Sequence, residues 1–288
     1  MTDPGRRESS GRPAAEGRAA VRAWRGPGPG RPDVPLPPGP MPAWRGGRPL
    51  KRWTWVGAFS EDAMLCAAIA RLGPATSSWW AVWDRRAGTL HERTRRHARG
   101  MTVTPERVVV PGVMELSVGD AAEVEVVSPH GAQYAWTRKR GGVRVRGTAM
   151  GLAIDAPGLV DESAGYHARR TAWRWSAGAG VTEDGEAVAW NLVDGLHDGA
   201  GASERTLWVG GEPRALGPVA FADGLDGVAF AEGGALRFTA EATRARRERL
   251  LLVASDYEQP FGAFAGELPG AGALRAGFGV MERHDVRW

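Results

Sequence analysis

The amino-acid sequence predicts an all-β protein made of two antiparallel domains, each a closed up-and-down barrel or a sandwich. From residue 51 onward, short runs of alternating apolar and polar side chains are separated by Gly and Asp turns roughly every 8 to 14 residues. No long helical pattern lies between these runs. A succession of hairpins is expected to close as a barrel or to pack as two sheets, because closure removes exposed sheet edges.

Residues 1–47 are expected to form a disordered tail. Half of the 20 prolines lie in residues 1–42, together with many Gly and Arg, and the apolar residues there follow no strand or helix period. Such a segment buries too little apolar surface to offset its loss of conformational entropy. The tail also carries the whole net charge of +4. The basic composition therefore gives little support to nucleic-acid binding, and we expect none.

The remaining chain is expected to divide into a first β domain, residues 48–160, and a second β domain, residues 161–288. Residues 48–150 hold 16 basic and 9 acidic side chains, whereas residues 151–288 hold 13 basic and 20 acidic ones. Net charges of +7 and −7 attract each other, so we expect the two domains to dock together.

Alternation predicts the individual strands. In the first domain they are expected at residues 52–59, 78–84, 107–110, 122–128, 134–138 and 143–149. In the second they are expected at residues 171–180, 186–192, 206–209, 219–222, 228–231, 235–240, 250–255, 261–268 and 274–288.

One segment has conflicting signals. Residues 63–72, AMLCAAIARL, have high helix propensity, with Ser60 at an N-cap position and Gly73 as a C-terminal stop. The surrounding alternation favours a strand. We predict a strand, because tertiary context often overrides local propensity.

Several classes of chemistry are excluded. Cys66 is the single cysteine, which rules out a disulfide framework and any multi-cysteine metal site. Lys51 and Lys139 are the two lysines, and neither lies in a P-loop motif. No G-x-S-x-G or H-E-x-x-H motif occurs, and the arginine-rich residues 91–97 are expected in a solvated loop. We therefore expect no metal and no cofactor.

The sequence also contains no apolar stretch of membrane-spanning length and no secretory leader in its first 30 residues. We expect a cytoplasmic protein without an integral membrane segment. The composition does not predict its oligomeric state.

The last predicted strand carries the strongest candidate site. Alternation places one set of side chains on a single face: Phe278, Val280, Glu282, His284, Val286 and Trp288. Glu282 and His284 are the ionisable members of this apolar row, and we expect each to perturb the pKa of the other, as acid–base sites require. The alternative is that cross-strand arginines or backbone groups satisfy both side chains.

A second candidate is the strand from residue 167 to residue 180. Trp173 and Trp175 share one face and could line a ligand cavity or stabilise a cation, whereas Arg170, a candidate ligand-binding group, lies on the other face. Core packing is the alternative role for both tryptophans.

Four further polar residues are candidates. Asp194 and Glu204 could act as acids, and Asn191 and Gln259 could bind a ligand. Asp194 and Gln259 also have structural interpretations, because Asp194 precedes Gly195 as in a turn and residues 257–262 have the composition of a tight connection.

The combination of motifs resembles a bacterial family catalogued as domain of unknown function 2804 (DUF2804). The segments that carry the resemblance are KRW at 51–53, WW at 79–80, WD at 83–84, YHARRTAWRW at 166–175, WNLVDG at 190–195, SE at 203–204, YEQPFG at 257–262 and VMERHDVRW at 280–288. The resemblance covers almost everything after residue 47. Arg205 departs from it, since Asn is expected after Glu204.

More distantly, two β domains with Trp-rich strands are similar in layout to the tandem lipocalin-like barrels of carotenoid hydratases and tocopherol cyclases. That similarity implies an apolar pocket and acid-initiated chemistry: an acid protonates a double bond, tryptophans stabilise the cation, and water or a hydroxyl captures it. The acid would be Asp194, Glu204, Glu282 or His284.

Three functions remain open. The first is binding of a hydrophobic small molecule, a lipid or isoprenoid, and the second is a hydratase, cyclase or isomerase acting on such a molecule. The third is a carbohydrate-directed sandwich. A cavity with only apolar walls would favour the binder. Glu282 and His284 facing a cavity, with a second acid across it, would favour the enzyme, and an open groove with surface Trp would favour a glycan.

Overall fold

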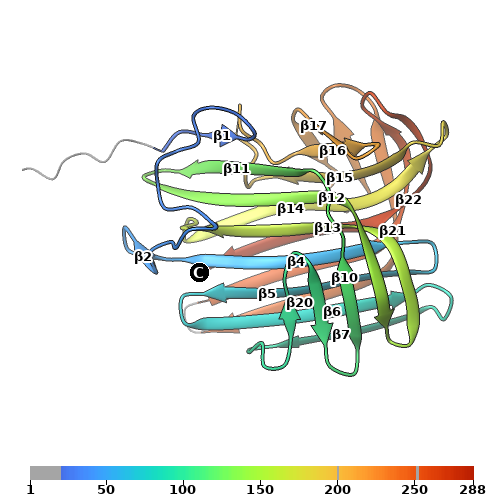
Figure 1. Ribbon diagram of the computed structural model, residues 1–288, viewed down its shortest axis with the longest axis horizontal. Coiled ribbons are helices and arrows are strands. Elements are labelled where there is room, and N and C mark those ends of the chain that lie inside the picture. The colour runs from blue at the N-terminus through green and yellow to red at the C-terminus, as the bar shows by residue number, and fades with distance from the viewer. Residues whose placement is uncertain (1–20, 200, 251–252) are drawn as a thin grey trace, which may run out of the picture.

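The structure, a computed structural model, describes residues 21–199, 201–250 and 253–288 of the 288 (Figure 1). Within these ranges the regular elements are all strands. Two large antiparallel sheets form the body of the molecule, and one small strand pair lies beside them. The predicted all-β fold is confirmed.

The first sheet has the strand order β7-β6-β5-β4-β13-β12-β10-β9-β8, with β11 pairing β12 and β1 pairing β11. Its strands are β1 (Trp24–Arg25), β4 (Lys51–Phe59), β5 (Ala63–Leu72), β6 (Ala75–Asp84), β7 (Thr89–Arg95), β8 (Thr102–Val103), β9 (Arg107–Val110), β10 (Met114–Val118), β11 (Glu123–His130), β12 (Gln133–Ala149) and β13 (Leu152–Gly165). The small pair is β2 (Trp44–Arg45) with β3 (Arg48–Pro49).

The second sheet has the order β17-β16-β15-β14-β22-β21-β20-β19-β18. Its strands are β14 (Arg170–Thr182), β15 (Ala187–Asp194), β16 (Thr206–Val209), β17 (Glu212–Ala215), β18 (Val219–Phe221), β19 (Gly227–Phe230), β20 (Ala235–Leu250), β21 (Val253–Leu268) and β22 (Gly272–Arg287).

Each sheet curls around its own apolar core to form a half-barrel (Figure 1). A third core lies between the two sheets and takes side chains from both. At its centre the ring of Trp55 on β4 meets the ring of Trp175 on β14 edge-on, with centroids 5.1 Å apart. Trp208 of the second sheet packs against Gly141 of the first, where a Cβ would overlap the indole. The expected docking of two β units is therefore present.

Ion pairs across the junction follow the predicted charge asymmetry. Basic groups of the first half-barrel and its loops meet acidic groups of the second in three pairs: Arg85–Glu241, Arg96–Glu248 and Lys139–Glu204. One pair, Arg244 with Glu92, runs the other way. Strand β13 continues to Gly165, so the predicted boundary at 160/161 falls inside a strand and the change of sheet follows residue 165.

Residues 63–72 form strand β5, as predicted. Met64, Cys66 and Ala68 face the core between the sheets, whereas Ala63 and Leu65 face the core of the first half-barrel. A strand buried on both faces has no polar alternation, and this is why its sequence looked helical.

Residues 21–47 differ from the expected disordered tail, while residues 1–20 lie outside the described residues. Strand β1 pairs with β11, and Leu36 is buried in a small core. The hydroxyls of Tyr134 and Tyr166 donate to the carbonyls of Pro35 and Pro42 at 2.6 and 2.7 Å. The segment is held by tyrosine donors and scattered apolar contacts, which leave no periodic pattern in the sequence.

Two further expectations are corrected, and a third extends outside the described residues. Residues 257–262 belong to the continuous strand β21, not to a tight connection, and residues 89–95 form strand β7 in place of part of the expected loop. The strand expected at 250–255 includes residues 251 and 252, which lie outside the described residues; β20 ends at Leu250 and β21 begins at Val253.

Candidate functional site

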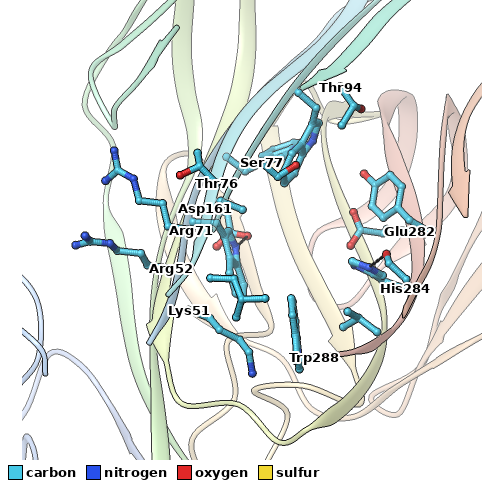
Figure 2. A pocket seen from close by; sticks show the side chains of 18 of the residues that line it. Lys51, Arg52, Arg71, Thr76, Ser77, Thr94, Asp161, Glu282, His284 and Trp288 are labelled. Atoms are coloured by element: carbon cyan, nitrogen blue, oxygen red, sulfur yellow. Dashed lines mark hydrogen bonds between the residues drawn. The ribbon is translucent and has the colours of Figure 1, made fainter. Parts of the chain in front are cut away.

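A cavity of about 610 Å³ lies between the two sheets (Figure 2). Strands β4, β5, β6 and β7 supply one wall, and β14, β20, β21 and β22 supply the other. Its apolar lining consists mainly of six tryptophans and a few aliphatic side chains: Trp53, Trp55, Trp79, Trp173, Trp175, Trp288, Leu72, Val193, Leu196 and Val286. Such a wall suits a ligand that is itself largely apolar.

The carboxyl group of Glu282 lies in this wall. Its Oε1 accepts a hydrogen bond from Trp173 Nε1 at 2.8 Å, and its Oε2 accepts one from Gln259 Nε2 at 2.9 Å. Burial raises the pKa of Glu282 to about 7, although the donors Trp173 and Tyr257 act to lower it. At neutral pH the group is therefore close to half protonated, as a general acid or base should be.

The Gln259 amide is held from its other side by the first sheet. The thiol of Cys66 on β5 lies 3.6 Å from Gln259 Oε1. Burial raises the pKa of Cys66 to about 11, so it stays protonated and can donate to that oxygen. This contact turns the NH₂ group of Gln259 toward Glu282.

His284, two residues beyond Glu282, also faces the cavity. Its Nε2 lies 2.8 Å from Ser255 Oγ, and its ring packs on Trp173 and Tyr257. Burial lowers the pKa of His284 to about 4, so the ring is neutral at pH 7. The pKa shifts of Glu282 and His284 arise from burial and from other neighbours, which corrects the expectation that each would perturb the other.

A second ionisable cluster lies in the cavity wall. Lys139 Nζ lies 2.5 Å from Asp161 Oδ1 and 3.2 Å from Glu204 Oε1. Burial acts to lower the pKa of Lys139, but the two carboxylates outweigh it and raise that pKa. Burial raises the pKa of Glu204, against the attraction of Lys139. The cavity thus contains acids besides Glu282.

Two neighbours fix this cluster. Trp53 Nε1 donates to Asp161 Oδ2 at 3.1 Å. Asn191 accepts a hydrogen bond from Trp175 Nε1 at 2.8 Å and donates to the backbone oxygen of Glu204 at 3.0 Å. Asn191 therefore supports two residues of the wall from behind.

Arg244 on β20 joins the sheets at another part of the cavity wall. Its side chain is almost fully buried and donates to Glu92 Oε2 at 2.7 Å, Thr94 Oγ1 at 3.2 Å and Tyr257 Oη at 3.2 Å. Since Glu92 and Thr94 belong to β7, this arginine links β7 to β20 and β21.

The structure brings together most of the residues predicted from the sequence. Six line the cavity: Glu204, Trp173, Trp175, Glu282, His284 and Trp288. Asn191 and Gln259 are fully buried and lie behind its wall. Glu282, His284 and Val286, on the even face of β22, line the cavity as alternation predicted, whereas Phe278 and Val280 of that face belong to the core between the sheets. Met281, on the odd face, belongs to the core of the second half-barrel.

Arg170 and Asp194 lie outside the cavity. Arg170 is on the opposite face of β14 from Trp173 and pairs with Asp285 at 2.7 Å on the surface. Asp194 is the last residue of β15, opposite Arg174, and is not part of the lining. Strand alternation turns Arg170 outward, so the structure does not place it in the site.

Several residues of the wall were missed. Lys51, Lys139, Asp161, Tyr257 and Arg244 all line the cavity. Lys51 and Tyr257 lie in segments that carry the family resemblance, but neither was a site candidate, and the other three lie in none of those segments. One signal was available, because both lysines of a chain in which arginine greatly outnumbers lysine lie in this cavity.

Within the part of the chain that the structure describes, no group of three or more His, Cys, Asp or Glu side chains is arranged to hold a metal ion. The same residues include no helix long and apolar enough to cross a membrane.

Two docked half-barrels with a tryptophan-lined cavity between them define a lipocalin-like, two-domain β protein. The model of the family described as "Domain of unknown function (DUF2804)" matches residues 112–288. The match covers more than half of the chain, so the protein belongs to this family.

Two solved structures are similar to this chain at low identity. A protein assigned as AttH from Nitrosomonas europaea has a TM-score of 0.46 and 13% identity, over 81% of this chain and 91% of that one. Kievitone hydratase from Nectria haematococca has a TM-score of 0.45 and 9% identity, over 81% of this chain and 88% of that one. No curated protein matches the chain. These similarities are too low to transfer an activity.

Proposed function

We propose that the protein is an enzyme that binds an unsaturated, largely apolar small molecule between its sheets and protonates it with Glu282. The observation that carries this proposal is a buried carboxyl group, with a pKa of about 7, in the wall of a tryptophan-lined cavity. A lipid or isoprenoid is the substrate class that fits such a wall.

The hydrogen bonds to Glu282 suit a proton donor. Trp173 and Gln259 each donate to one carboxyl oxygen, so they stabilise the carboxylate that remains when the proton leaves. Burial has the opposite effect and disfavours the charged form. The balance keeps the proton available at neutral pH.

The reaction would begin as Glu282 gives its proton to one carbon of a double bond. The O–H bond breaks, a C–H bond forms, and the π electrons leave a cation on the neighbouring carbon. The tryptophan faces stabilise that cation, as do the carboxylates of Asp161 and Glu204. Water or a hydroxyl of the substrate then adds to the cation, and its proton returns to Glu282. If the Glu282 carboxylate instead takes a proton from a carbon next to the cation, the electrons of that C–H bond form a double bond in a new position, which is isomerisation.

Binding without turnover is the second candidate. It is favoured by the fact that both Glu282 oxygens already accept hydrogen bonds, as they would in a purely structural role. A glycan is disfavoured, because the tryptophans gather in a cavity between the sheets and Trp44 alone is exposed among the described tryptophans.

Extraction of the purified protein, followed by mass spectrometry, identifies any ligand that accompanies it. The ligand and its analogues are then tested for binding by the rise in melting temperature and for conversion by product analysis. We expect Glu282→Gln to keep binding and lose conversion. Glu258→Gln is the matched control, since Glu258 is on the neighbouring strand and pairs with Arg283 on the surface. Binding of no lipid or isoprenoid would contradict both candidates.

A further inference from the structure

The two lysines of the chain both line the cavity, but their surroundings differ. Lys139 is balanced by the carboxylates of Asp161 and Glu204. Lys51 is buried, with 3% of its surface exposed, and it forms no ion pair with any described carboxylate. Its Nζ donates to the backbone oxygen of His167 at 3.2 Å and lies 4.5 Å from the ring centroid of Trp288.

This leaves the ammonium group only partly satisfied. An ammonium has three N–H donors, and one backbone oxygen uses one of them. Burial lowers the pKa of Lys51 to about 8, and the neighbouring cation Arg48 acts in the same direction. The nearby rings of His130 and His167 add no negative charge. A buried cation without an anion is costly, and an anionic ligand group would remove that cost.

Lys51 and the proposed acid, Glu282, lie at separate places along the cavity. Figure 2 shows Lys51, on β4, beside Trp288, and shows His284 and Glu282 farther along the opposite wall, to which Trp288 belongs. Trp288 and Glu282 share one face of the last strand and are six residues apart. Six residues of a strand span roughly 20 Å, so the head group of a ligand can lie at Lys51 while its hydrocarbon part points along the wall toward Glu282.

We infer that the cavity takes an amphipathic ligand whose anionic head group, a carboxylate or a phosphate, pairs with Lys51 while its hydrocarbon part extends along the tryptophan wall toward Glu282. This inference rests on the proposed function, since it assigns the class of molecule that the same cavity binds.

The test compares dodecanoate, dodecyl phosphate and dodecanol, which share one hydrocarbon chain, by titration calorimetry with the full chain. We expect at least one anion to bind about tenfold to a hundredfold more tightly than dodecanol. The preference for dodecyl phosphate over dodecanoate, or the reverse, identifies the head group. Added salt should weaken binding of the anions and leave dodecanol unaffected.

Lys51→Met removes the charge at similar length and should abolish the preference without changing the affinity for dodecanol. Lys51→Arg should keep part of it. Arg275→Ala, which removes a cation from an exposed part of β22 outside the cavity lining, is the control and should bind like the wild type. Melting temperatures show whether each variant is folded. If Lys51→Met does not fold, the salt dependence of anion binding to the wild type still tests the inference.

Equal affinity of the wild type for all three ligands would overturn the inference, while the proposal that the cavity binds an apolar molecule would be unaffected. A preference that survives in folded Lys51→Met would also overturn it. Failure of all three ligands to bind would overturn the cavity's proposed function as well.

Discussion

Trp173 and Glu282 meet across strands β14 and β22, where the indole Nε1 donates to the carboxyl Oε1 at 2.8 Å. This contact ties the ionisation of Glu282 to one side chain of the cavity wall. Because Trp175 is directly opposite Glu282 in the strand register, Trp173 reaches the carboxyl group diagonally. The protonation state of Glu282 should therefore affect the rate and the stability of the protein, and both can be measured as a function of pH.

Turnover should depend on pH through Glu282. A general acid must be protonated, and the pKa of this group is about 7. We expect the rate to be high below pH 7 and to fall tenfold for each pH unit well above it. His284 has a pKa of about 4 and is not expected to add a second transition between pH 5 and 8. A rate that is flat from pH 6 to pH 9 would contradict this role.

Removing the indole donor should move that pH profile. In Trp173→Phe the carboxylate loses a hydrogen bond, so the pKa of Glu282 should rise and the fall in rate should shift to higher pH. The free energy of unfolding should drop by about 1.5 to 3 kcal/mol. Trp190→Phe is a control, because Trp190 donates to Ser176 and belongs to the core of the second half-barrel. It should lose stability and leave the profile in place.

Glu282 should also make stability depend on pH. Its pKa is about 7 in the folded protein and 4.5 as the unperturbed reference, so the folded state holds the proton more tightly. The resulting stability is present below pH 4.5 and is lost as pH rises through 7. Between these values the wild type should lose about 3 kcal/mol relative to Glu282→Gln. Urea unfolding of both proteins at pH 4.5 and 8 measures this, and a constant difference would refute it.

Removing one charge from the cluster of Lys139, Asp161 and Glu204 should destabilise the folded protein. Lys139→Met leaves two buried carboxylates without their cation, and we expect a loss of about 3 to 5 kcal/mol in the free energy of unfolding. The triple variant Lys139→Met, Asp161→Asn, Glu204→Gln removes all three charges and should recover much of it. Chemical denaturation measures the free energy of unfolding of the two variants. Equal values would show that the charges are not coupled.

The buried histidines at the junction should make the fold acid-sensitive. His167 and His197 are buried with ring centroids 5.9 Å apart, and burial lowers the pKa of both well below 6.5. The unfolded chain takes up these protons first, so stability is full above pH 6.5 and falls below it. Each histidine contributes up to about 1.4 kcal/mol per pH unit. His197→Gln should show a shallower loss between pH 6.5 and 5 in urea unfolding. An unchanged slope would exclude His197 as a contributor.

Alternation predicted part of one wall of the cavity. It placed Glu282, His284 and Trp288 on one face of the last predicted strand, and it paired Trp173 with Trp175 on β14. These features depend on period-two geometry within single strands, which local sequence determines.

Contacts between strands were not predictable in the same way. Lys139 meets Asp161 because β12 and β13 pair in that register, and it meets Glu204 because the second sheet docks there. Neither the register nor the docking leaves a pattern in the sequence around any one of these residues. The same limit explains residues 21–47, whose attachment depends on tyrosine hydroxyls from distant strands.

The transfer of a proton from Glu282 to a carbon atom of the ligand is tested most directly in D₂O. The ligand recovered from the protein, or its nearest unsaturated analogue, is incubated with the wild type and with Glu282→Gln, and the deuterium bound to carbon is measured by mass spectrometry. If Glu282 is the donor, the wild type places one deuterium on a former double-bond carbon and Glu282→Gln places none. Equal incorporation by both proteins, or incorporation by neither while the ligand remains bound, would contradict a catalytic role for Glu282.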